Sequence, residues 1–378
     1  MTALLNTSLL LLLLCAPSAF AGSGSGDGDP AVFNGLPYPI EATFSGTQKI
    51  GAVLLETPYS EPPAAAYDTI LVQGLMTDPG ARVDFSVKAR GLFSRPAQVT
   101  QTSFRRYPNG RFWAKYRVEL NAQPLKLKII NTGAPEGASV SVYETELLAG
   151  EATRETPVAA STVPYVPDPA LFVPDAAPFK IVRRAAWGAL PPTEPYSTHT
   201  PVAFTLHHTQ GNYPQTFEAA RNEVQFIQDY HQNAKEWIDI GYHFVIDPSG
   251  NIFEGRPIGV LGAHVVRRNP GNVGISIIGN YHPPVNNPVT RASLDSFVSV
   301  GGYVKDTYSV HVSSFYAHRE IGNSDCPGDG LYAKKPEIKD LIFKPQPRAR
   351  AVKVLPSDAP PMTPAQQKAL KLLLGSFD

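Results

Sequence analysis

The sequence has few cysteines and no net charge. The first argues against a disulfide-stabilised protein, and the second against a nucleic-acid-binding protein. Its 378 residues include two cysteines, Cys15 and Cys326. Basic and acidic residues balance at 33 each, and charged residues make up only 17%. A neutral chain lacks the positive field that draws proteins onto nucleic acid, so no nucleic-acid partner is expected. Aromatic residues reach 10% and apolar runs recur, which excludes a wholly disordered chain.

A signal peptide is predicted at residues 1–21. Leu9–Leu14 is a leucine run too short to span a bilayer, and Ala19-Phe20-Ala21 has the small-x-small pattern of a cleavage site. The lack of Lys or Arg near Met1 is unusual for a signal, and an uncleaved anchor is the alternative. Cleavage removes Cys15, so no internal disulfide is expected. We expect an exported protein, periplasmic or extracellular, without a transmembrane segment after cleavage.

Residues 31–146 and 147–178 differ sharply in composition. The first range alternates apolar and polar side chains in short runs, with Asn109-Gly110 as a hairpin turn, and predicts an all-β, sandwich-like domain. The second range is rich in proline and alanine and has no glycine from Glu151 to Pro178. This composition predicts a semi-stiff spacer, and hence two domains that fold independently.

Residues 179–343 alternate strand and helix patterns. Strands are predicted at 202–209 and 274–278, a hairpin at 242–254, helices after Thr216 and at 290–305, and a strand ending near His318. This order predicts an α/β domain with a mixed central sheet flanked by helices. Residues 344–378 form a basic, proline-rich tail, and its last residues have the cap and apolar face of a short helix.

The residues that suit metal chemistry lie at predicted strand ends. His207 and His208 close the first strand of the α/β range, His318 closes a later one, and Cys326 follows in a loop. Two imidazoles and one thiolate suit zinc, and three protein ligands leave the fourth position for water, as in catalytic zinc sites. From spacing alone, scattered surface histidines and a buried cysteine are an equally good interpretation.

The motifs of residues 179–343 occur in the order found in a known family. The range resembles the zinc amidase domain of the peptidoglycan recognition proteins and phage-type N-acetylmuramoyl-L-alanine amidases. The resemblance rests on eight stretches: Ile181–Gly188, Leu206–Thr209, Asp239–Phe244, Phe253–Arg256, Gly262–His264, Gly274–Asn280, Ala317–Glu320 and Cys326–Asp329. It covers less than half of the chain and leaves residues 31–146 unexplained.

The resemblance implies one zinc ion per chain, held by His207, His318 and Cys326. It further implies that Tyr242 assists the reaction and that Ser324 stands where the family has Thr or Lys. The implied activity is hydrolysis of the bond between N-acetylmuramic acid and L-alanine, with peptidoglycan or muropeptides as partners. The alternative is a non-catalytic peptidoglycan-binding protein, against which the presence of Cys326 argues.

Other residues receive weaker interpretations. His208, Thr209 and His264 are candidate substrate contacts, although His208 faces away from His207 in a strand. Pro257-Ile258 stands where the family reads the third stem-peptide residue, so the preference for diaminopimelate or lysine stays open. Trp113 either contacts a sugar or a partner, or is covered by a loop or by the second domain. A cell-wall glycan and a protein are both candidate partners of the N-terminal domain.

Overall fold

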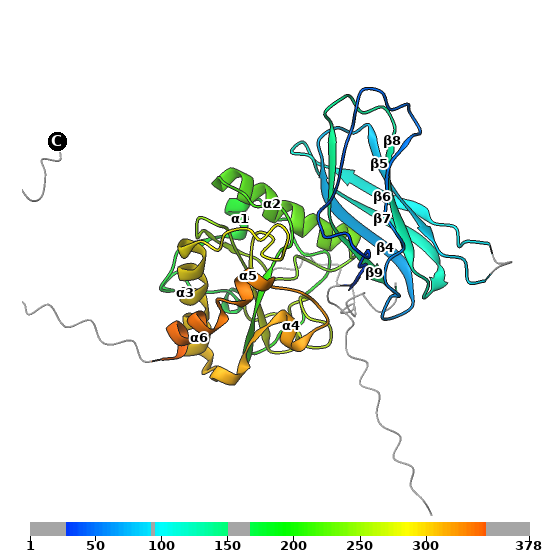
Figure 1. The fold of residues 1–378 in the computed structure, drawn as a ribbon. Helices are drawn as coiled ribbons and strands as arrows, with labels where there is room; N and C mark the ends of the chain where they lie inside the picture. The colour runs from blue at the N-terminus through cyan, green and yellow to red at the C-terminus, as the bar shows by residue number, and fades with distance from the viewer. Residues whose placement is uncertain (1–27, 92–94, 150–166, 345–378) are drawn as a thin grey trace, which may run out of the picture. The chain divides into compact units, whose positions relative to one another are not determined.

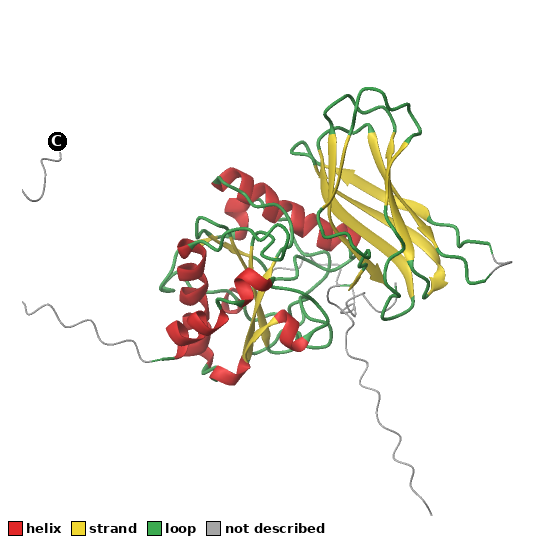
Figure 2. Ribbon diagram, viewed as in Figure 1, coloured by secondary structure: helices red, strands yellow, loops and turns green. Residues whose placement is uncertain are grey.

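The computed structural model describes residues 28–91, 95–149 and 167–344 (Figure 1). Three predictions fall outside these ranges: the signal peptide, the spacer from residue 150 to 166, and the short helix of the tail. Figure 2 shows a strand-rich N-terminal region and a C-terminal region of mixed strands and helices. Within the described ranges, the helices are too short or too polar to cross a membrane.

The N-terminal region consists of two antiparallel sheets. One has the order β1-β9-β4-β7-β6, with β2 also paired to β9, and the other has the order β3-β8-β5. The predicted turn at Asn109-Gly110 is confirmed between β6 and β7, where Gly110 has a φ of +85°. The strands are β1 (Asp29–Pro30), β2 (Ile40–Thr43), β3 (Val53–Glu56), β4 (Tyr67–Met76), β5 (Ala81–Val87), β6 (Thr100–Arg106), β7 (Arg111–Asn121), β8 (Leu125–Asn131) and β9 (Ser139–Leu148).

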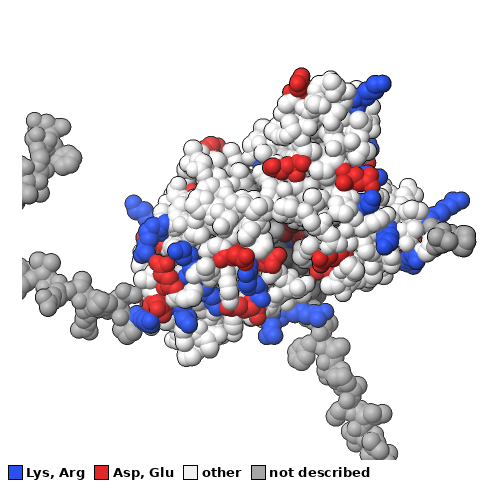
Figure 3. Space-filling view, in the orientation of Figure 1, with Lys and Arg blue, Asp and Glu red and all other residues white. Residues whose placement is uncertain are grey.

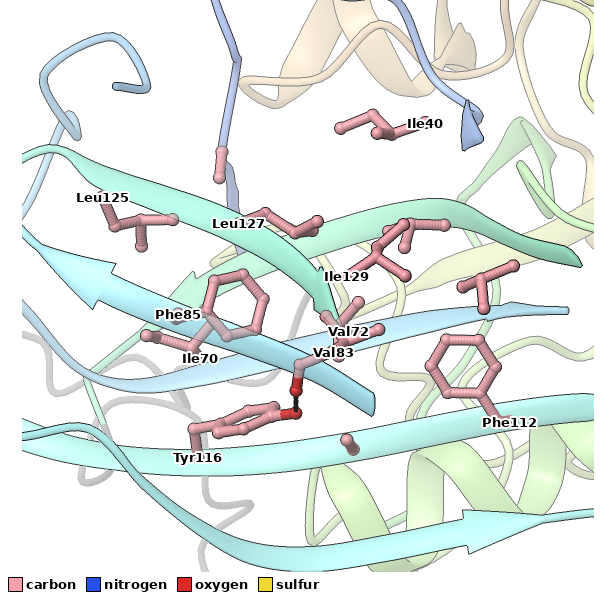
Figure 4. Packing of buried hydrophobic residues seen from close by; sticks show 14 of the residues in the cluster. Ile40, Ile70, Val72, Val83, Phe85, Phe112, Tyr116, Leu125, Leu127 and Ile129 are labelled. Carbon is pink, nitrogen blue, oxygen red and sulfur yellow. Dashed lines mark hydrogen bonds between the residues drawn. The ribbon is translucent and has the colours of Figure 1, made fainter. Parts of the chain in front are cut away.

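The two sheets contribute side chains to one hydrophobic cluster (Figure 4). Leu125, Leu127 and Ile129 of β8 alternate with lysines that are only half-buried, as their period-2 pattern predicts. They belong to the same cluster as Phe112 of β7, and the hydroxyl of Tyr116 donates a hydrogen bond to the carbonyl of Val83. The apolar half of each alternating run therefore forms the core of this region.

The C-terminal region is built on a mixed sheet of order β10-β13-β12-β14-β11-β15. Strands β12, β14, β11 and β15 run parallel, and β13 pairs antiparallel with β12. The strands are β10 (Ile181–Val182), β11 (Ala203–His208), β12 (Phe244–Ile246), β13 (Ile252–Glu254), β14 (Asn272–Ile277) and β15 (Phe315–Ala317). The helices are α1 (Arg184–Trp187), α2 (Phe217–Asp229), α3 (Arg291–Tyr308), α4 (His318–Ile321), α5 (Asp329–Tyr332) and α6 (Lys335–Phe343).

The two helices predicted for this region begin within one residue of their predicted starts. The Thr216 hydroxyl accepts a hydrogen bond from the amide of Ala219 at the start of α2, and Thr290 caps α3 in the same way. Helix α3 continues through Gly301 to Tyr308, and a β-carbon added at Gly301 would lie 2.6 Å from Ile342 Cδ1. Gly301 therefore lies close to the side chain of Ile342 in α6.

The outward face of β7 is buried as well, which its polar residues did not predict. Arg111, Trp113 and Lys115 are exposed by 1%, 3% and 6%, respectively. Trp113 belongs to one hydrophobic cluster with Phe226 and Tyr230 of the α/β region, and its indole donates a hydrogen bond to Asp229. Trp113 is therefore covered by the second region.

Two buried ion pairs connect the strand-rich region to the α/β region. The guanidinium of Arg111 donates two hydrogen bonds of 2.9 Å to the carboxylate of Glu223 on α2. Lys235 lies 2.7 Å from Glu146 of β9, and both side chains are 2% exposed. Removing one partner of such a pair typically costs about 3–5 kcal/mol, because a charge is left buried. These buried contacts do not fit the independent folding of the two regions that the spacer predicts.

The end of the predicted spacer packs against the α/β region. The carbonyl of Leu171 accepts a hydrogen bond of 2.9 Å from Gly259. The Leu171 side chain packs against the cluster of Tyr196, Ile238 and Val260. A proline-rich composition predicts an extended chain but not the surface against which that chain lies. The described part of the spacer is therefore held in place from about residue 168.

Candidate metal centre

The predicted zinc ligands lie at or after the carboxyl ends of two neighbouring parallel strands. Strand β11 pairs in parallel with β15, so their carboxyl ends lie together. His207 lies near the end of β11, and His318 follows directly after β15 as the first residue of α4. The loop after α4 returns Cys326, where its carbonyl accepts a hydrogen bond of 2.9 Å from the amide of Arg319.

His207, His318 and Cys326 form a compact, buried group. One ligand atom from each lies within 4.8 Å of the others, and no other such group of His, Cys, Asp and Glu occurs among the described residues. The Cys326 Sγ is 3.6 Å from Nδ1 of His207, and the rings of His207 and His318 are 4.7 Å apart. The three predicted ligands therefore lie where a single ion would contact all of them.

The burial of His207 keeps its imidazole in the form that binds metals. Desolvation, with smaller contributions from His318, His264 and His208, lowers the pKa of His207 well below its usual value. The ring is therefore neutral at neutral pH and presents a lone pair rather than a second proton. A metal ion binds without first displacing that proton.

A hydrogen-bond chain behind His207 determines which nitrogen keeps the proton. Nε2 of His264 lies 3.0 Å from the carbonyl oxygen of Asn272, which only accepts hydrogen bonds, so Nε2 must donate. In a neutral ring, Nδ1 of His264 then accepts, and its partner at 3.0 Å is Nε2 of His207. The lone pair of His207 is left on Nδ1, the atom that faces Cys326. The donor set and its tautomer therefore fit zinc.

The position of His264 depends on small neighbours. A β-carbon added to Gly274 would lie 2.6 Å from two carbon atoms of the His264 ring. Asn269 accepts a hydrogen bond of 2.8 Å from the His264 amide. His264 has no exposed surface. Its observed contact is with His207, a predicted metal ligand, and its substrate contact stays a prediction.

Replacing His264 by alanine should weaken zinc binding about 10- to 100-fold, because the tautomer and orientation of His207 would no longer be fixed. His264→Asn should remain close to wild type, since Oδ1 of asparagine can accept the His207 hydrogen bond where Nδ1 now does. Competition with a chromophoric chelator measures both affinities. Wild-type affinity in His264→Ala would show that this contact does not orient the ligand.

Tyr242 and Ser324 lie beside the metal ligands. Tyr242 is 7% exposed, and its ring centre is 5.3 Å from that of His207. The Ser324 hydroxyl accepts a hydrogen bond of 3.1 Å from the amide of Cys326. Both residues line the same cavity as Cys326. They therefore lie next to the three predicted ligands, where they could contact a group bound to an ion held there.

His208 and Thr209 lie next to this group but face other partners. Nδ1 of His208 accepts a hydrogen bond of 3.3 Å from the amide of Tyr281. The Thr209 hydroxyl accepts one of 3.0 Å from the amide of Gly279. Both residues line the cavity, so their proposed substrate contacts stay predictions that this placement permits.

Several other polar residues of the motifs have structural partners. The guanidinium of Arg256 donates hydrogen bonds to the carbonyls of Ile240 and Leu261 and is 1% exposed. His243 is fully buried and lies 2.8 Å from the carbonyl of Val260. Glu320 accepts a hydrogen bond of 2.8 Å from the amide of Ala317 and so caps α4. These contacts indicate that Arg256 and His243 have structural roles.

Comparisons with known proteins identify relatives of the α/β region. A family model described as N-acetylmuramoyl-L-alanine amidase matches residues 197–329. Peptidoglycan-recognition protein SC2 of Drosophila melanogaster is 35% identical over 157 residues, which is 40% of this chain and 82% of that protein. Human N-acetylmuramoyl-L-alanine amidase is 30% identical over 191 residues, which is 48% of this chain and 32% of that protein.

The similarity extends to solved structures. The crystal structure of Drosophila peptidoglycan recognition protein SD aligns with 41% of this chain and 91% of its own, at 25% identity and a TM-score of 0.39. The family model and the relative SC2, most of whose length is covered, show the relationship of the α/β region. The chain belongs to the family of peptidoglycan recognition proteins and N-acetylmuramoyl-L-alanine amidases.

Proposed function

We propose that this protein is an exported zinc hydrolase that cleaves the amide bond between N-acetylmuramic acid and L-alanine in peptidoglycan. The observation that carries the proposal is the convergence of His207, His318 and Cys326 beside Tyr242. A thiolate and two neutral imidazoles suit zinc, and three ligands leave a position for water. Export rests on the leader sequence, and the two N-terminal sheets, which share one core, are proposed to pack as a sandwich.

The chemistry divides between the ion and the chain's own side chains. When bound, zinc would lower the pKa of a water molecule to about 7 and polarise the scissile carbonyl. Tyr242 would donate its hydroxyl proton in a hydrogen bond to the carbonyl oxygen as that oxygen gains negative charge. His264 holds the proton of His207 on Nε2, as its hydrogen bonds require.

Ser324 has the geometry to hold a second oxygen. Its hydroxyl oxygen accepts from the amide of Cys326, so its own proton remains for donation. Serine retains the hydroxyl that threonine has at this place in the family but lacks the charge of lysine. We therefore assign Ser324 the positioning of an oxygen of water or substrate rather than charge neutralisation.

The test uses a soluble substrate with a single scissile bond. Full-length protein with zinc should release L-alanyl-D-isoglutamine from N-acetylmuramoyl-L-alanyl-D-isoglutamine. Chromatography of the reaction mixture measures this release. Removing zinc with a chelator should stop the release, and added zinc should restore it. Calorimetric binding of this substrate without any product, at full zinc occupancy, would favour the recognition protein and contradict the hydrolase.

A further inference from the structure

The cavity beside the metal ligands is lined by residues of both regions. Cys326, Tyr242 and Ser324 form part of its wall, and Gln73 and Glu144 of the strand-rich region form another part. Its volume is about 70 Å³. That is room for about five water molecules or for a small substituent such as an acetamido group. A substrate at the metal centre therefore comes close to side chains from outside the family domain.

The strand-rich wall of this cavity is held by buried contacts. The guanidinium of Arg111 donates to Gln73 Oε1 at 2.7 Å as well as to Glu223 of α2. Gln73 in turn donates from Nε2 to Glu144 at 3.0 Å. Gln73 is 5% exposed, whereas Glu144 is only half-buried. These hydrogen bonds hold the Gln73 amide in place. Glu144 lies at the end of this chain of contacts that is more accessible to solvent.

The charges around the cavity favour a neutral ligand. Its acidic lining residues are Glu144, Glu223 and Asp325, and its basic ones are Arg111 and Lys235. Both basic groups already form ion pairs, Arg111 with Glu223 and Lys235 with Glu146. A carboxylate-rich stem peptide would meet an acidic excess here, whereas hydroxyl and N–H groups are good donors to a carboxylate. On the visible face, acidic and basic side chains are interspersed (Figure 3).

We propose that Gln73 and Glu144 form a subsite for a neutral N-acetylated sugar of the glycan, next to the metal centre. The amide and the carboxylate accept hydrogen bonds from the sugar's hydroxyl or acetamido N–H groups, and a substituent of the ring enters the cavity. The strand-rich region is therefore a part of the substrate site and not only an anchor. This inference rests on the proposed function for the identity of the substrate.

The test compares Glu144→Ala in the full-length protein with wild type on two substrates. One is N-acetylmuramoyl-L-alanyl-D-isoglutamine, and the other is lactoyl-L-alanyl-D-isoglutamine, which has the same scissile bond without the sugar. Glu144→Ala should raise KM about 10-fold for the first substrate with little change in kcat, and leave kcat/KM unchanged for the second. Glu41→Ala, an exposed residue of β2 outside the cavity lining, is the matched control and should leave both unchanged.

Binding of N,N′-diacetylchitobiose, which has no scissile amide, separates this subsite from the proposed function. Calorimetry should give about 10-fold weaker binding for Glu144→Ala than for wild type, at equal thermal stability. If neither peptide is hydrolysed but chitobiose binding still falls, the hydrolase fails and the subsite stands. Unchanged chitobiose binding, or an equal loss on both peptides, would overturn the subsite.

Discussion

Replacing Cys326 by alanine should abolish hydrolysis and weaken zinc binding by orders of magnitude, while binding of muropeptides largely survives. The thiolate is the only anionic member of the ligand group, so its loss removes both a ligand and the charge that partly neutralises the ion. Other residues of the cavity, such as Thr209 and Tyr242, remain to contact the substrate. Metal analysis, chromatography of products and calorimetry together measure the three quantities.

The serine variant is the matched comparison for this experiment. Cys326→Ser keeps the size of the side chain, but a hydroxyl loses its proton far less readily than a thiol, so zinc binding should still fall steeply. If Cys326 were only a small buried apolar group, Cys326→Ala would be nearly silent in every assay. Hydrolysis at the wild-type rate by zinc-free Cys326→Ala protein would contradict the zinc mechanism.

Replacing Tyr242 by phenylalanine should lower turnover about 10²- to 10³-fold with zinc still bound. The change removes one hydrogen-bond donor to the developing oxyanion and leaves the aromatic ring that packs near His207 and His231. KM should change much less than kcat, because the lost hydrogen bond is strongest in the transition state. Steady-state kinetics and metal analysis on the same sample measure both effects.

A second tyrosine provides the control for this substitution. The Tyr213 hydroxyl donates a hydrogen bond to the carbonyl of Pro288, and the residue does not line the cavity. Tyr213→Phe also removes one hydroxyl and should leave turnover near the wild-type rate. Unchanged turnover in Tyr242→Phe at full zinc occupancy would remove Tyr242 from the mechanism.

The main strands and helices between residues 202 and 318 and the grouping of the three predicted ligands were predictable from the sequence, whereas β10 and the short helices α1, α5 and α6 were not predicted. Strand β11 and helix α2 have clear periodicities and a cap at Thr216, which depend on neighbouring residues only. His207, His318 and Cys326 lie in short motifs whose order matches the family. Spacing alone left a scatter of surface histidines equally possible, and the parallel pairing of β11 with β15 brings them together.

The contacts between the two regions were not predictable in the same way. Arg111, Trp113 and Lys115 alternate with apolar residues, and a polar face of a strand ordinarily indicates solvent. Here the partner of Arg111 is Glu223, 112 positions away, and the partner of Lys115 is Glu236, 121 positions away. A local pattern contains no information about a partner at that distance. The subsite at Gln73 and Glu144 was hidden for the same reason.

The role of His264 shows the same limit within one region. The Gly-Ala-His motif identified the residue, but a groove-lining position and a buried one have the same sequence signature. Its contact with His207 depends on the carbonyl of Asn272 and on the space left by Gly274. Both are features of the folded backbone, and neither changes the residue type at position 264.

The central claim is that this protein cleaves the amide between the lactyl group of muramic acid and L-alanine. Mass spectrometry of the products from purified sacculi in ¹⁸O-labelled water tests it most directly. The expected products are free stem peptides that begin with an unmodified L-alanine amine, and glycan whose new lactyl carboxylate carries one ¹⁸O atom. Intact sacculi, or fragments cut within the glycan or the peptide while the lactyl–alanine bond survives, would contradict it.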